Sequence, residues 1–406
     1  MSSLTRLLTG TSPAVTAGPV PAAAQEVVAE LPDAQPMGEF VADISTRLDQ
    51  SYAMLVVNRA GPDAFTITGK HRDNRLHLRA STMPRPELAL GDMADNESAA
   101  RERARNIRYL MQSWSRQAES LREWVERLRA TVGDGNLRLV VWDDTGYEIP
   151  WELLYLPGDE QEGRADGWLG QLLAVTRMVT IHSFDPRRRP NPLELGDHVC
   201  TGDAVAWAID DMRADLASIN RFNPLRCRSN DELLDRLYDT APLGLVYIAA
   251  HGKFSDRMTE LTLDDLGLEA FDYGDLPGLH ASHGLVFMNA CHSGRLLNDV
   301  RVNLSLFGFA ELFLRQGAAT VIGAAGKVDT DIARTVADQI FQEIVRDPAI
   351  PVAEAVRLVR ARAATRVDGR RPAMEALKEF LYTFMYVCYG NPFTRLAVPP
   401  DGGGDD

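Results

Sequence analysis

The sequence predicts an α/β protein built on a mostly parallel β-sheet with helices on both faces. Continuous apolar runs at residues 243–250 (LGLVYIAA), 284–290 (GLVFMNA) and 318–325 (AATVIGAA) are typical of strands that are buried on both sides. A stretch with helical periodicity, residues 306–315, lies between the last two runs. The composition, 45% hydrophobic and 25% charged over 406 residues, predicts a core that needs no disulfide or metal to hold it together.

Three segments follow one another between the ends of the chain. Residues 37–95 contain short β-prone runs broken by turn residues, which predicts a small unit of antiparallel hairpins. Residues 96–135 have the apolar spacing of one or two amphipathic helices. Residues 136–397 alternate strands with helices and form the main domain, in which we expect a helix at 203–222 and a last strand at 381–390.

The composition of the two ends of the chain predicts disordered tails. Residues 1–36 are rich in Ala, Pro, Thr and Gly without periodicity, and residues 398–406 end in PPDGGGDD. The N-terminus lacks the apolar core of a secretion signal, and no apolar run approaches the roughly 18 residues of a membrane span. We therefore expect a cytoplasmic protein without a membrane partner.

The net charge and the spacing of the cysteines argue against a nucleic-acid-binding protein, a disulfide-rich protein and a zinc protein. A net charge of −14 is unfavourable for binding nucleic acid directly, because such binding depends on clustered lysine and arginine. The four cysteines contain no CxxC pair and lie far apart, at positions Cys200, Cys227, Cys291 and Cys388. They predict reduced thiols instead of a disulfide framework or a zinc site.

Two of the predicted strands end in reactive side chains. His251 follows the run at 243–250, and Cys291 follows the run at 284–290. If these parallel strands are neighbours, both side chains lie at the same edge of the sheet, where ligands bind in open α/β folds. An imidazole beside a thiol lowers the pKa of the thiol and makes a nucleophile near neutral pH.

The residues around this pair fit the same chemistry. Gly252 and Gly294 allow the backbone to come close to a bound carbonyl, and the amides of Gly252 and Cys291 are predicted to form an oxyanion hole. His292 is an alternative base, but a side chain adjacent to a nucleophile usually points elsewhere, so we favour His251. Taken singly, each of these residues also fits a structural role. The prediction of a catalytic site therefore rests on the occurrence of His251 and Cys291 at the ends of two predicted strands.

The motifs AAHGKF and LVFMNACHSG resemble the catalytic signature of caspase-like (clan CD) cysteine peptidases. They are more specifically similar to the CHAT family, bacterial caspase-like domains related to separase. Residues 149–152 (IPWE), the segment LFGFAELFLRQGAATVIGA and the closing FMYVCYGNP resemble other parts of that family. The resemblance covers about residues 100–397 and implies a caspase-like sheet in that region.

The resemblance implies a cysteine endopeptidase with His251 as general base, Cys291 as nucleophile and the amides of Gly252 and Cys291 as oxyanion donors. This chemistry requires no metal or organic cofactor, although related metacaspases use calcium. Metacaspases carry an acidic residue two positions before the cysteine, where this chain has Asn289. The segment VDTDI resembles the separase segment that binds a P1 arginine, so Asp329 or Asp331 would line the substrate pocket, unless these aspartates cap a helix instead.

At the family level the resemblance implies a protease of bacterial defence or stress signalling. Its partners would be a protein substrate, such as an operon-encoded effector, and an activator or regulator protein. Two other hypotheses remain open: a catalytically silent caspase-like scaffold, and a thiol acyltransferase that uses the same site. The presence of both His251 and Cys291 favours an enzyme over the scaffold.

Overall fold

The protein is described from a computed structural model of the chain. The structure describes residues 50–89, 100–159, 161, 163–181, 195–255, 257–298, 306–367 and 372–400. The tail expected at residues 1–36, and residues 401–406 of the tail expected at the other end, lie outside the described residues.

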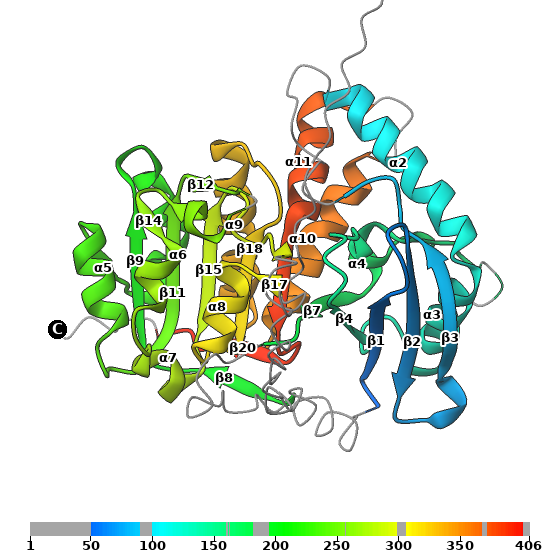
Figure 1. Cartoon of the computed structure of the whole chain (residues 1–406), viewed down its shortest axis with the longest axis horizontal. Coiled ribbons are helices and arrows are strands. Elements are labelled where there is room, and N and C mark those ends of the chain that lie inside the picture. Colours follow the sequence, from blue (N-terminus) through cyan, green and yellow to red (C-terminus); the bar gives the residue numbers. More distant parts are fainter. Residues whose placement is uncertain are drawn as a thin grey trace, which may run out of the picture. The chain divides into compact units, whose positions relative to one another are not determined.

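An 11-stranded sheet, in the order β10-β9-β11-β15-β18-β19-β7-β4-β1-β2-β3, forms the centre of the fold (Figure 1). Neighbouring strands are parallel except between β1 and β2, between β2 and β3, and between β18 and β19. The predicted α/β class, a mostly parallel sheet flanked by helices, is confirmed. Its strands are β1 (Tyr52–Arg59), β2 (Ala64–His71), β3 (Leu78–Pro84), β4 (Arg138–Asp143), β7 (Ala174–Met178), β9 (Asp203–Ala208), β10 (Leu225–Cys227), β11 (Leu243–Ala250), β15 (Leu285–Ala290), β18 (Thr320–Ala324) and β19 (Tyr386–Gly390).

Helices cover both faces of this sheet (Figure 1). α7 and α8 pack on β11 and β18, while α9, α10 and the 3-10 helix η5 pack on one another and on the sheet. No helix in the described segments has an apolar stretch long enough to cross a membrane. The helices are η1 (Asn74–Leu76), α2 (Ala100–Gln117), α3 (Glu119–Val132), η4 (Trp151–Leu153), α4 (Leu169–Leu172), η5 (Asp210–Phe222), α5 (Asn230–Leu237), η6 (Met258–Glu260), α6 (Leu268–Asp272), α7 (Pro277–Ser282), α8 (Phe309–Arg315), α9 (Thr330–Arg346), α10 (Val352–Val367) and α11 (Met374–Met385).

Short sheets of two or three strands are separate from the large sheet. One of them, the antiparallel β12-β13-β14, begins immediately after the candidate base His251. These short sheets pair β5 (Tyr155–Leu156) with β6 (Gly167–Trp168), β8 (His198–Cys200) with β20 (Thr394–Leu396), β12 (Gly252–Lys253) with β13 (Thr262–Leu263) and then β14 (Leu266–Gly267), and β16 (Leu297–Asn298) with β17 (Leu306–Phe307).

The N-terminal strands continue the large sheet. β1, β2 and β3 pair antiparallel, as the turn signals predict, and β1 also pairs in parallel with β4. α3 covers this end, and the indole nitrogen of Trp124 donates to the Leu76 carbonyl oxygen at 2.5 Å. Gly69 makes room for that ring, because a Cβ on this residue would lie 2.5 Å from it.

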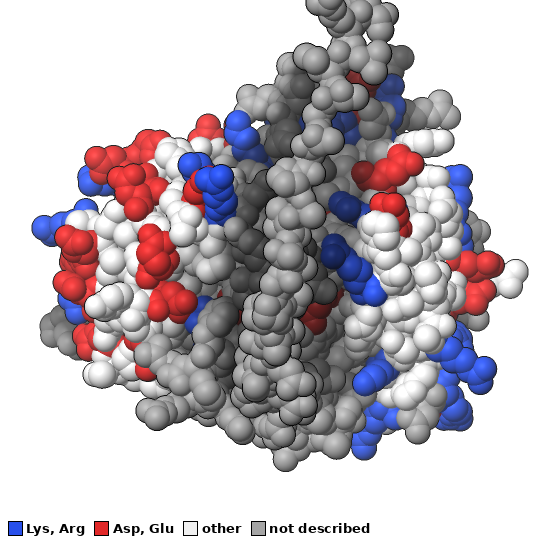
Figure 2. Space-filling model, in the orientation of Figure 1, with Lys and Arg blue, Asp and Glu red and all other residues white. Residues whose placement is uncertain are grey.

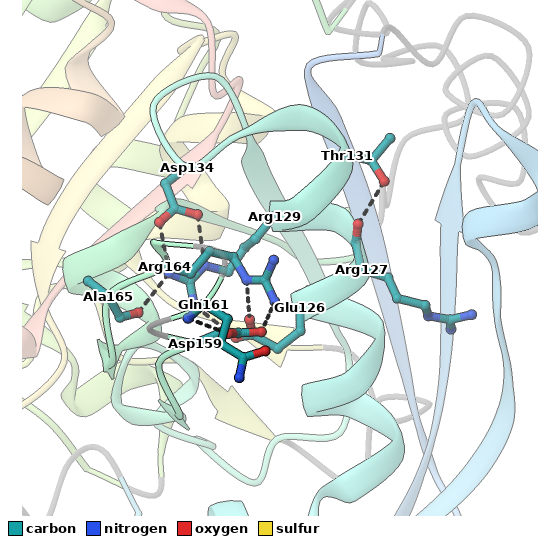
Figure 3. Close-up of polar contacts among 9 residues, drawn as sticks. All are labelled: Glu126, Arg127, Arg129, Thr131, Asp134, Asp159, Gln161, Arg164 and Ala165. Atoms are coloured by element: carbon teal, nitrogen blue, oxygen red, sulfur yellow. Dashed lines mark hydrogen bonds and ion pairs between the residues drawn. The ribbon is translucent and has the colours of Figure 1, made fainter.

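The side chains of Arg129 and Arg164 connect α3 with the loop between β5 and β6 (Figure 3). The fully buried Arg129 donates to Asp134 at 2.7 Å, to Glu126 at 2.8 Å and to the Ala165 carbonyl at 2.9 Å. Arg164 reaches the same Glu126 at 3.3 Å from the other segment. One carboxylate therefore joins two guanidinium groups that lie far apart in the sequence.

Two secondary-structure predictions were wrong. Residues 203–222, expected as one helix, form β9 and then η5, because the five buried apolar residues 204–208 have no periodicity that separates a strand from a helix. Residues 381–390, expected as one strand, end α11 at Met385 before β19 begins at Tyr386. The packing of α11 on α2, α9 and α10 outweighs the β-prone composition of that run.

The charged side chains differ between the two ends of the sheet. On the face shown in Figure 2, acidic side chains gather over the end that carries α5 and α6. Lysine and arginine gather over the end that carries β2 and β3. The excess of acidic residues in the sequence is therefore distributed unevenly on this face.

Candidate active site

The register of β11 and β15 places the two candidate catalytic residues side by side. These strands are parallel neighbours, and Ala250 is the partner of Ala290. His251 and Cys291 are the next residues of each chain segment, so they emerge together at the carboxyl ends of the strands. This is the edge where open α/β sheets bind their ligands.

Gly252 lies directly against the backbone of Cys291. A Cβ at position 252 would stand 1.7 Å from the Cys291 carbonyl oxygen and 3.2 Å from its amide nitrogen. Only glycine allows this approach. Gly252 thus makes room for the backbone of Cys291. That it also makes room for a bound carbonyl stays a prediction.

The turn after Cys291 is held in place by the next strand. His292 has the left-handed φ of 58°, and its amide donates to the Gly326 carbonyl at 3.0 Å. The Gly294 amide donates to the Ala324 carbonyl at 2.9 Å, and a Cβ at Gly294 would lie 2.6 Å from the Gly323 carbonyl oxygen. The second glycine of the motif thus also serves the packing of backbone on backbone.

Cys291 differs from the other three cysteines in its exposure. Its side chain is partly buried, and the Val328 amide points at its sulfur at 3.4 Å. The other three thiols are buried, and burial raises the pKa of Cys200 and Cys388 to about 12 and that of Cys227 to about 11. Cys291 is therefore the cysteine of this chain that is partly exposed to solvent.

His251 has a carboxylate partner that the sequence reasoning missed. Its Nε2 lies 3.0 Å from Oδ2 of Asp211, and the two side chains are 63% and 64% exposed. Asp211 follows β9, which pairs with β11 on the side opposite β15. The prediction of a helix at 203–222 concealed this neighbour, because the apolar run AVAWA at residues 204–208 was the signal for a third strand ending at the same edge.

Asn289, two residues before Cys291, is buried in a polar cluster. Its amide nitrogen donates to Oδ2 of Asp215 at 2.5 Å, and its oxygen accepts from the hydroxyl of Tyr386. All three residues are fully buried. Burial raises the pKa of Asp215 to about 6, against the effect of the hydrogen bond from Asn289 and the attraction of Arg334.

A model of the CHAT domain matches residues 115–374. The chain belongs to the CHAT-domain family. The match includes both strands of the site and the two candidate catalytic residues. No curated protein gives a significant match.

Solved structures show distant similarity to this CHAT protein. Two structures of the Saccharomyces cerevisiae separase–securin complex match at 16% identity with a TM-score of 0.40, and at 10% identity with a TM-score of 0.48. They cover 68% and 88% of this chain but only 17% and 31% of the matched chains. The complex of the pro- and mature domains of Porphyromonas gingivalis RgpB matches at 13% identity and a TM-score of 0.40, covering 74% of this chain and 78% of that one. The CHAT protein thus spans less than a third of the separase chains.

The two aspartates of the VDTDI segment have different surroundings. Asp329 caps α9 and accepts hydrogen bonds from the amides of Asp331 at 3.1 Å and Ile332 at 3.2 Å. Asp331 is 82% exposed and pairs with Arg334 at 2.9 Å. Asp329 therefore caps a helix, as the alternative prediction held, whereas Asp331 is accessible from solvent.

The alternative base His292 packs beside an aromatic ring. Its imidazole lies 6.2 Å from the ring centroid of Phe254, which in turn is covered by the guanidinium of Arg295 at 4.1 Å. Within the described segments no three His, Cys, Asp or Glu side chains converge as metal ligands would.

Proposed function

We propose that this CHAT protein is a cysteine endopeptidase. The observation that carries the proposal is the register of β11 and β15, which makes His251 and Cys291 neighbours at the carboxyl edge of the sheet. In the proposed reaction His251 accepts the Cys291 proton, and the thiolate attacks the scissile carbonyl carbon. The imidazolium then protonates the leaving amine, and water releases the acyl group from sulfur.

We propose that the amides of Gly252 and Cys291 stabilise the oxyanion of this reaction. The close approach of these two residues supports the assignment, since it brings both backbones to the nucleophile. Removing one donor of an oxyanion hole costs about 2.7–4 kcal/mol of activation free energy in well-studied hydrolases.

We propose that the substrate pocket prefers a basic residue and that Asp331, Asp329 and Asn289 contribute to it. The VDTDI segment, residues 328–332, begins next to the proposed nucleophile, because the Val328 amide contacts the Cys291 sulfur. Asp331 offers an exposed carboxylate there, whereas Asp329 and Asn289 act by fixing the helix start and the buried cluster. A cationic side chain would be attracted by this arrangement.

A cytoplasmic role in bacterial defence or stress signalling is proposed from the resemblance alone. In that role the enzyme would cut a protein substrate, such as an effector encoded in the same operon, after an activator protein binds. The N-terminal 130 residues would either pack on the catalytic domain, as β1 does by pairing with β4, or recruit this activator or the substrate.

Cleavage of co-expressed operon neighbours tests the proposed activity. The wild-type protein is expected to yield fragments that Cys291→Ala does not yield, with a loss of at least a thousandfold in rate. Cys227→Ala is the matched control, because this thiol is buried on the edge strand β10. Identical fragments from wild type and Cys291→Ala would show that the assigned nucleophile is wrong.

Alkylation by iodoacetamide separates the alternatives. An activated Cys291 is expected to be alkylated selectively below pH 8 in the native protein, and this selectivity is lost in His251→Ala. Slow, uniform labelling of all four cysteines would favour the silent scaffold. Transfer of an acyl group to added amines, without hydrolysis, would identify an acyltransferase instead.

A further inference from the structure

The contact between Asp211 and His251 determines which imidazole nitrogen can act as base. Asp211 Oδ2 lies 3.0 Å from Nε2 of the ring. A carboxylate accepts hydrogen bonds and does not donate them, so Nε2 carries a proton in both charge states of the ring. Nδ1 is then the nitrogen with a lone pair when the imidazole is neutral.

We propose that Asp211 is a positioning residue that holds His251 as an Nδ1 base for Cys291. This inference rests on the proposed peptidase function. The S–H bond of Cys291 breaks and its electron pair stays on sulfur, while the proton forms a new bond to Nδ1. The resulting imidazolium is stabilised by the negative charge of Asp211 at the opposite nitrogen, and later gives the same proton to the leaving amine.

The backbone brings Asp211 to this place. β9 pairs with β11 through Ala208 and Ala249, and the Ile209 amide extends the pairing to the Ala249 carbonyl at 3.1 Å. The chain turns into η5 at the next residue, which places Asp211 beside the end of β11. Strands β9, β11 and β15 thus contribute carboxylate, imidazole and thiol in the order in which they lie in the sheet.

Three other charged residues lie close to His251 along the chain or through the backbone. Asp210, adjacent to Asp211, pairs with Arg213 at 2.6 Å. Asp264 approaches His251 through its backbone, with its amide donating to the His251 carbonyl at 2.6 Å. Lys253 follows on β12. Among the described residues, Asp211 is the carboxylate whose oxygen is in hydrogen-bond contact with the His251 ring.

The exposure of the pair argues for a role in reactivity. Both side chains are about two-thirds exposed, and an exposed ion pair contributes less than about 1 kcal/mol to folding. Removing the carboxylate should therefore leave the fold intact. A bound peptide would cover the pair and exclude water, which strengthens the attraction between imidazolium and carboxylate.

The test measures the rate of Cys291 alkylation by iodoacetamide between pH 5.5 and 9.5 in the full chain. We expect Asp211→Asn to slow alkylation about tenfold at pH 6.5. The rates should converge at pH 9.5, where a thiol ionises without help from a base. Asp210→Asn is the matched control, and its alkylation rate should stay within about twofold of wild type. Asp211→Glu keeps a carboxylate and should restore most of the rate. A defect in folding alone would not depend on pH in this way and would not be rescued by glutamate.

Two results would overturn the inference in distinguishable ways. If Asp211→Asn follows the wild-type profile while His251→Ala is slow, the imidazole activates the thiol without Asp211, and the proposed peptidase stands. If His251→Ala also follows the wild-type profile, the thiol is not activated by this imidazole, and both the positioning role and the proposed function fall.

Discussion

Glu152 and Asp215 are both fully buried carboxylates, but the molecule surrounds them in opposite ways. Glu152 lies in η4, near the strands β4 and β7. Asp215 lies in η5, beneath the candidate active site. The first belongs to the scaffold of the sheet and the second to the region that carries the proposed chemistry.

Arginine neutralises Glu152. Arg177 binds it at 3.1 and 2.5 Å, and Arg360 lies 3.9 Å away. Burial alone would raise the pKa of Glu152, but the charges of these two guanidinium groups outweigh burial and hold the pKa below its usual value. Glu152 is therefore ionised at neutral pH and stabilises the fold in that form.

Asp215 has an amide as its close partner instead of a cation. Asn289 donates to one oxygen, and the other oxygen has no hydrogen-bond partner among the described residues. Asp211 and Asp331 add repulsion, so the pKa, already raised by burial, reaches about 6. Of these two carboxylates, the one in the scaffold is paired closely with arginine, whereas the one beneath the candidate active site lacks a close cationic partner and keeps a raised pKa.

Glu152→Gln should produce the largest loss of stability. The substitution leaves Arg177 and Arg360 as buried charges without a carboxylate, which costs about 3–5 kcal/mol in comparable pairs. Chemical denaturation of wild type and variant measures this loss as a difference in the free energy of unfolding. A loss below about 1 kcal/mol would show that the scaffold does not depend on this ion pair.

Asp215→Asn should have a smaller effect of opposite sign. The unfolded state releases the Asp215 proton near its ordinary pKa and the folded state only near pH 6, so the folded state binds more protons between these values. Wild-type stability therefore falls as pH rises from about 4 to 6, by at most about 3 kcal/mol for this group. The variant should be about 1–3 kcal/mol more stable than wild type at pH 7.5.

The pH dependence of unfolding checks this expectation. The difference between the wild-type and Asp215→Asn curves isolates Asp215 from other buried acids, such as Glu311, whose pKa burial raises to about 7. Parallel curves between pH 4 and 6 would contradict the proposed difference between scaffold and site.

Asp331→Asn should have the smallest effect on stability. Its ion pair with Arg334 is exposed, so we expect a change of less than about 1 kcal/mol in thermal denaturation. If Asp331 lines the substrate pocket, cleavage after basic residues should fall more than cleavage after neutral ones. An equal fall at all cut sites would remove Asp331 from the pocket.

The candidate site could be predicted in part because its main residues belong to strands with an unmistakable pattern. The run that became β11 is continuously apolar, the run that became β15 is apolar except for Asn289, and the candidate catalytic residues follow them directly. Asp211 could not be found in this way, because the Ala-rich run before it also fits a helix. Nor does the sequence reveal that Asn289 faces Asp215 and Tyr386, since these residues meet only through strand pairing and helix packing.

The sequence by itself determined the α/β class and pointed to His251 and Cys291 as the candidate pair, because hydrophobic periodicity and short motifs are local properties of the chain. Only the tertiary structure decided which strands are neighbours, that Gly252 serves the Cys291 backbone, and that Glu152 and Asp215 have opposite surroundings. These features depend on distances between residues far apart in the sequence. Electrostatic interactions depend on those distances and on burial, and neither is a property of any single segment.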